Sequence, residues 1–106
     1  MTKVNAVAVL DTIATTLVVQ DRYATKDLAI RALAQTAVRT KINSYQRRIR
    51  RLQGKYGMDF AAFSKTVEGS ASPQQENDWF SWRSALSMLD EWQTVYQGLT
   101  DEPTHY

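Results

Sequence analysis

The chain has 106 residues and a formal net charge of +2, with four glycines, two prolines and no cysteine. This length supports one small domain with a modest core. The lack of cysteine excludes a disulfide framework and thiolate metal sites, and few glycines and prolines favour helices over a sandwich or barrel.

Residues 1–24 form the first segment, and its apolar side chains recur at helical spacing over residues 4–20. They are Val7, Leu10, Ile13, Ala14, Leu17 and Val18. Many residues here are β-branched, which favours a strand. We favour a helix, because the apolar residues do not alternate with polar ones. Asp11 interrupts the apolar run and no clean cleavage site follows it, so we expect neither a signal peptide nor a membrane span. We expect the protein to be cytoplasmic.

A long basic helix is predicted next, capped by the Thr25 hydroxyl and ended by Gly57 in a left-handed turn. Its apolar seam alternates spacings of four and three residues: Val38, Ile42, Tyr45, Ile49, Leu52 and Tyr56. No acidic residue lies between Asp27 and Asp59, whereas the bases are Arg31, Arg39, Lys41, Arg47, Arg48, Arg50, Arg51 and Lys55. At ~1.5 Å per residue the helix is about 45 Å long, so other segments must pack along it.

A tight corner is predicted after Gly57. Asp59 is a good N-cap for a short third helix. Met58, just before this cap, can pack against Phe63 in the first turns of that helix. Residues 67–72 are expected to be a polar loop.

The last helix is predicted to start near Pro73, because Ser72 to Gln75 form a capping box with proline at the first helical position. We expect it to run to about Gln97, with Gly98 behind it and a polar tail over residues 100–106. Its seam is Trp82, Ala85, Leu89, Trp92, Tyr96 and Leu99, with further apolar residues flanking it. An apolar surface this wide needs more than one neighbour.

These elements predict an all-α, single-domain chain over residues 1–106. The long and last helices form an antiparallel hairpin with a short corner helix and an N-terminal helix. The wide apolar surface of the last helix further predicts a homo-oligomer.

Catalytic chemistry finds little support in the sequence. The single histidine, His105, is next to the C-terminus, and no phosphate-binding loop or nucleophile with a plausible base is present. Glu76 and Asp78 are explained as favourable charges at the start of a helix. We therefore expect no enzyme activity, no metal and no cofactor.

Two residue groups are candidate contact sites for a partner. The first is the basic face, Arg47, Arg48, Arg50, Arg51 and Lys55. It is either a solvated helix surface or a binding surface for phosphates or an acidic partner. The second is the aromatic group, Trp79, Phe80 and Trp82, which is largely expected in the core. Phe80 lies away from the seam and would mark a contact surface if exposed.

Two stretches together resemble the TumA-type antitoxins of type II toxin–antitoxin pairs. They are RRLQGKYGMDFAAFSK, residues 50–65, and ENDWFSWRSALSMLDEW, residues 76–92. The matching residues are Tyr56, Gly57, Met58, Phe60 and Phe63, followed by Asp78, Trp79, Trp82 and Leu86. The resemblance implies a small binding protein that neutralises a cognate toxin by protein–protein contact, and it supplies no catalytic residues.

The alternative is a nucleic-acid-binding or structural adaptor protein that uses the basic face. The small net charge and the absence of a recognition motif favour a protein partner over DNA or RNA.

Overall fold

The computed structural model describes residues 6–20 and 23–101 of the chain. Within that part the chain forms helices only, namely α1 (Ala6–Val19), α2 (Lys26–Tyr56), α3 (Phe60–Gly69) and α4 (Pro73–Asp101). The all-α prediction is therefore confirmed. None of these helices is long and apolar enough to cross a membrane.

α1 is a helix despite its β-branched residues, so the strand alternative is wrong; residues 4 and 5 lie outside the described part. The hydroxyls of Thr12 and Thr16 donate to the carbonyl oxygens four residues earlier, at 3.0 and 2.9 Å. These bonds give the threonine hydroxyls partners inside a helix.

Both predicted ends of α2 are confirmed. The Thr25 hydroxyl accepts a hydrogen bond from the Leu28 backbone N–H at 3.1 Å. Gly57 adopts φ +65°, and its N–H donates to the Gln53 carbonyl at 2.7 Å. A side chain would be strained in this left-handed conformation, which explains why glycine ends the helix.

The caps of α3 and α4 are also as predicted. The Asp59 carboxylate accepts from the Ala62 N–H at 2.8 Å. Ser72 and Gln75 cap each other, with Gln75 N–H donating to the Ser72 hydroxyl at 3.1 Å and Ser72 N–H donating to the Gln75 side chain at 2.8 Å.

Two predicted boundaries are wrong. The loop expected over residues 67–72 is shorter, because α3 continues to Gly69 and half-buried Val67 packs against the core. α4 continues past Gly98 to Asp101, where a polar tail was expected to begin. Gly98 has no positive φ, so it is accommodated as an ordinary helical residue.

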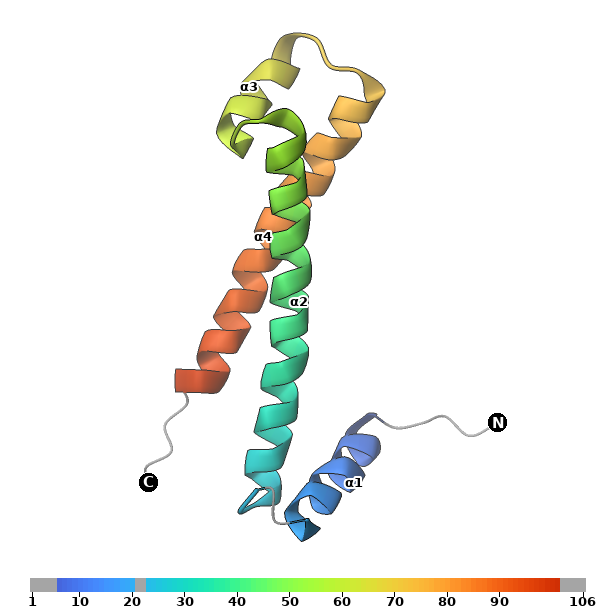
Figure 1. Ribbon diagram of the computed structural model, residues 1–106, viewed down its shortest axis with the longest axis vertical. Helices are drawn as coiled ribbons and strands as arrows, with labels where there is room; N and C mark the ends of the chain where they lie inside the picture. The colour runs from blue at the N-terminus through green and yellow to red at the C-terminus, as the bar shows by residue number, and fades with distance from the viewer. Residues whose placement is uncertain (1–5, 21–22, 102–106) are drawn as a thin grey trace, which may run out of the picture.

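The hairpin prediction is confirmed in the packing of α2 against α4, which run antiparallel (Figure 1). Their core lies at the end of the molecule where α3 connects them. Phe63 and Trp82 are its largest fully buried side chains, with ring centroids 5.5 Å apart. The buried cluster consists of Ile49, Leu52, Phe63, Trp82 and Ala85.

Away from this core the helices separate. α4 diverges from α2 towards its C-terminal end, and α1 packs beside the first half of α2 (Figure 1). The radius of gyration is 19.7 Å, against about 13 Å for a compact domain of this length. We call α1 and residues 86–101 of α4 the two arms of the molecule.

The arms expose much of their apolar surface. Val7 of α1 is 73% exposed and Val95 of α4 is 47% exposed. On α1 only Ala14 is buried. The predicted seam residues Trp92, Tyr96 and Leu99 of α4 are half-buried, whereas Val38 and Ile42 of the α2 seam are buried.

Candidate protein-interaction surfaces

A polar network joins the end of α2 to the start of α4. Asp78 is its centre, with a side chain only 14% exposed. Lys55 Nζ donates to Asp78 Oδ2 at 2.7 Å, and the Tyr56 hydroxyl donates a short hydrogen bond to the same oxygen. Gln74 Nε2 donates to Asp78 Oδ1 at 3.2 Å. Both carboxylate oxygens therefore have donors, and the corner is tied across 22 and 23 residues of sequence.

The network shifts three pKa values in directions that favour a charged Asp78, a charged Lys55 and a neutral Tyr56. The hydrogen bonds from Lys55, then from Tyr56, lower the pKa of Asp78 below its ordinary 3.8. The hydrogen bond to Asp78 raises the pKa of Lys55 above 10.5 and that of Tyr56 above 10.0. At neutral pH the group is a carboxylate held by an ammonium and a neutral phenol, which is a structural arrangement and not an acid–base pair.

The three aromatic residues predicted as contact residues have different environments. Trp82 is fully buried beneath Phe60 and Phe63, so its prediction as a partner contact is corrected: it belongs to the core of this chain. Trp79 is half-buried, and its indole N–H donates to the Ser64 hydroxyl at 2.8 Å. Phe80 is 61% exposed, as a contact residue requires.

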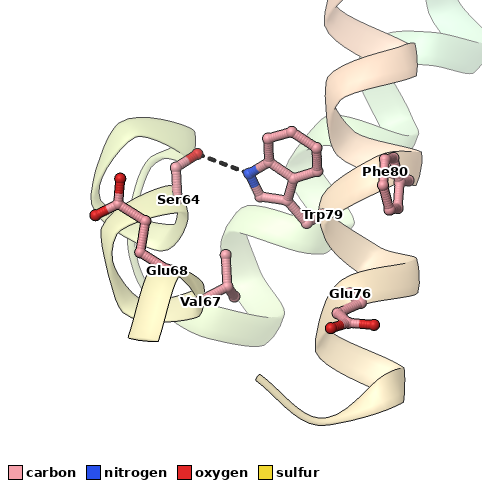
Figure 2. A pocket seen from close by; sticks show the side chains of 6 residues that line it. All are labelled: Ser64, Val67, Glu68, Glu76, Trp79 and Phe80. Atoms are coloured by element: carbon pink, nitrogen blue, oxygen red, sulfur yellow. Dashed lines mark hydrogen bonds between the residues drawn. The ribbon is translucent and has the colours of Figure 1, made fainter. Parts of the chain in front are cut away.

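An open cavity of about 500 Å³ lies between α3 and α4 beside these aromatic residues. Figure 2 shows that its walls come from both helices. Its lining residues are Ser64, Val67 and Glu68 from α3, and Glu76, Trp79 and Phe80 from α4. Two acidic and two aromatic residues are therefore among its lining residues.

Arg83 contacts the same aromatic group from outside the cavity. Its guanidinium carbon lies 5.5 Å from the centre of the Trp79 ring. Phe80 meets the Trp79 ring edge-on, with centroids 5.1 Å apart and planes at 83°. The ring of Trp79 is thus packed among Phe60, Phe80 and Arg83.

The basic face predicted on α2 divides into two parts. Lys55 belongs to the Asp78 network and has a structural role. Arg47, Arg50 and Arg51 are exposed and have no hydrogen bond or ion pair from their side chains within residues 6–20 and 23–101. Arg48 is half-buried, with its guanidinium carbon 5.4 Å from the centre of the Tyr45 ring. Their spacing places Arg47, Arg50 and Arg51 next to one another on the solvent side of the helix.

Sequence reasoning missed the cavity residues Ser64, Val67 and Glu68, and read Glu76 only as a helix-start charge. Glu68 had one detectable signal. It lies in the last turn of α3, where the negative end of the helix disfavours a carboxylate. That residues of α3 and α4 line one cavity depends on how the two helices fold together, which no local pattern specifies.

The described part of the chain has no group of three or more histidine, cysteine or acidic side chains that could hold a metal ion. His105 lies outside that part. The geometry provides surfaces that can bind: an aromatic and acidic cavity, a basic face and two apolar arms. Comparisons of the chain with protein-family models, curated proteins and solved structures find no match.

Proposed function

We propose that this chain is an antitoxin-like binding protein that neutralises a cognate toxin by protein–protein contact. The observation that carries the binding function is the open shape. α2 and α4 share one core at the corner, and several apolar side chains of the arms, Val7 and Val95 among them, stay exposed. Exposed apolar surface of this kind marks an interaction site in a soluble protein.

The class of partner is supported by the resemblance at the corner. Its residues lie together: the Tyr56 ring centre is 4.1 Å from that of Phe63, and the Phe60 ring centre is 5.6 Å from that of Trp79. The motif therefore corresponds to one packed structural unit. A shared corner supports a shared arrangement of helices in the antitoxins that the chain resembles.

Self-association is part of the proposal. A stable interface buries about 800 Å² on each partner. Val95 on α4 is exposed, and the helical spacing places half-buried Trp92 and Tyr96 on adjoining parts of the same helix surface. A second copy packed on this arm would remove these side chains from water and leave the corner and the basic face accessible to a toxin.

Co-expression with the product of the adjacent gene tests the toxin partner. That product alone should arrest growth, the chain should restore growth, and the two should purify as one complex. Failure of both readouts would contradict the antitoxin proposal.

Sedimentation velocity at micromolar concentration tests self-association. The wild-type chain should sediment as a dimer or larger species. Val95→Asp should shift it towards monomer, because the change places a charge in a buried apolar contact. Ser87→Asp introduces the same charge at an exposed polar position of α4 and is the matched control. A monomeric wild-type chain would contradict self-association.

The unpaired arginines of α2 favour a second candidate function, binding of DNA or RNA phosphates. Three exposed guanidinium groups without acidic partners in the described chain fit a polyanion. Filter binding at low salt tests this alternative. Micromolar affinity that falls steeply with salt, and is lost in Arg47→Glu/Arg50→Glu/Arg51→Glu, would support it over the toxin-binding function.

A further inference from the structure

The N-terminal part of the chain has more apolar surface than it buries. α1 packs beside the first half of α2 (Figure 1), and we call α1 together with residues 26–38 of α2 the N-terminal hairpin. Among the described residues of this hairpin only Ala14, Ala29 and Val38 are buried. Its larger apolar side chains that are at least 40% exposed are those of Val7, Val9, Leu10, Ile13, Val19 and Leu28. A pair of helices with this excess of exposed apolar residues needs a further neighbour.

α1 is apolar on most of its circumference. Asp11 is its only charged residue, and the carboxylate is paired with the Lys26 ammonium at 2.8 Å. Leu10, Ile13 and Leu17 recur at spacings of three and four residues, so they form one stripe along the helix. None of these three side chains is buried. A helix this apolar is normally covered on more than one side, whereas α1 has α2 as its main neighbour.

The charge of the N-terminal hairpin is balanced, which suits contact with an identical surface. Residues 6–38 contain three acidic and three basic residues, whereas residues 39–56 contain seven basic residues and no acidic one. In a two-fold dimer the same patch meets itself, so a patch with an excess of one charge repels its own copy. The N-terminal hairpin can therefore meet a second copy without the repulsion that the basic half of α2 would produce.

The accessible surface of the chain is large enough for such a contact. A compact chain of 12.1 kDa exposes about 6000 Å². This chain exposes 7893 Å², which is an excess of about 1900 Å². A standard dimer buries about 800 Å² on each copy, less than half of that excess. A single contact between copies on α4 would therefore leave surface for a second one.

We propose that the N-terminal hairpins of two copies pack against each other as a four-helix bundle, with the stripe of Leu10, Ile13 and Leu17 in the interface. In such a bundle α1 gains a second neighbour, and the stripe is removed from water. The corner lies at the other end of α2 and stays accessible (Figure 1). This inference rests on the self-association in the proposed function and adds a contact separate from the one on α4.

Sedimentation velocity at micromolar concentration tests the bundle without any other protein. With both contacts intact, the wild-type chain should form a species larger than a dimer. Leu10→Asp/Ile13→Asp places charges in the bundle and should leave a dimer that is held by α4. Val95→Asp should reduce the assembly to a dimer that is held by the N-terminal hairpins. The chain with all three substitutions should be a monomer.

Thr12→Asp/Thr15→Asp is the matched control. It adds the same two charges to α1 at the same spacing, at exposed positions about 200° round the helix from the stripe, and it should sediment as the wild type. Leu10→Ala/Ile13→Ala tests the stripe without a new charge, and alanine favours the helix. In the Val95→Asp chain this change should raise the dissociation constant of the remaining dimer at least tenfold, because apolar atoms are lost from the interface.

Three results would overturn the bundle: Leu10→Asp/Ile13→Asp that sediments as the wild type, Val95→Asp that is a monomer, or an unchanged dissociation constant in the alanine variant. If Leu10→Asp/Ile13→Asp keeps the assembly but releases a co-expressed toxin, the stripe binds the toxin and not a second copy. The contact on α4 fails separately. A wild-type dimer that Leu10→Asp/Ile13→Asp alone converts to a monomer would keep the bundle and remove the contact on α4.

Discussion

Asp78→Asn tests whether the polar network holds the corner together. Asparagine keeps the size of the side chain and one acceptor for the Tyr56 hydroxyl, but it removes the charge. A hydrogen bond to a charged group contributes about 1.5–3 kcal/mol and one between neutral groups about 0.5–1.5 kcal/mol. The bond from half-buried Tyr56 should therefore lose about 1–2 kcal/mol, and exposed Lys55 should add little.

This loss should be visible in a thermal melt. A chain of 106 residues has an unfolding entropy of about 0.22 kcal/mol/K, at ~2.1 cal/mol/K per residue. The melting temperature of Asp78→Asn should therefore fall by about 5–9 °C at fixed protein concentration. Asp90→Asn on the same helix is exposed and should change it little.

The pH dependence gives an independent check. Because the pKa of Asp78 is lowered by folding, its contribution is fully present above its ordinary 3.8 and is lost as pH falls through the lower folded value. The pKa values of Tyr56 and Lys55 are raised, so their contributions are present below their ordinary 10.0 and 10.5 and are lost as pH rises through the folded values. The wild-type chain should lose stability at both ends, and Asp78→Asn should lose less. An unchanged melting temperature in Asp78→Asn, with the same acid profile as the wild type, would refute this reasoning.

Four further substitutions test the core, the turn and the N-terminal ion pair, each measured by urea unfolding. Trp82→Ala should lower the free energy of unfolding by about 3–5 kcal/mol because Trp82 is fully buried, whereas Phe80→Ala should lower it by less than about 1 kcal/mol; equal effects would contradict the packing. Gly57→Ala should cost about 1–2 kcal/mol, since alanine is strained at φ +65°, and no cost would mean that the turn rearranges. Asp11→Asn removes the exposed ion pair with Lys26 and should cost less than about 1 kcal/mol, so a larger loss would show that the pair fixes α1 on α2.

Helix ends were predictable because a cap is decided within a few residues. Thr25 needs only the N–H of Leu28, and Ser72 needs only Gln75. Gly98 was misread for a related reason: glycine permits a left-handed turn but does not impose one. The backbone stays helical after Gly98, and α4 continues to Asp101.

Contacts between helices were predictable only where a periodic seam has its partner in the same chain. The periodic seam that contains Ile49 and Leu52 was predicted to pack on the seam that contains Ala85, and these three residues do lie in one buried cluster. Trp92 follows the same rhythm on α4, yet it is half-buried. A seam shows that a helix face needs a neighbour, and it does not say whether the neighbour is the same chain, a second copy or another protein.

Neither the Asp78 network nor the cavity was predicted, because each depends on residues from two different helices. Asp78 was read as a charge at a helix start, and Lys55 as part of a basic face. Each description is correct for its own helix, but the corner brings the two residues to 2.7 Å. The same fold brings residues of α3 and α4 together at the cavity. Of the acids near this corner, Asp78 therefore holds α4 against the end of α2.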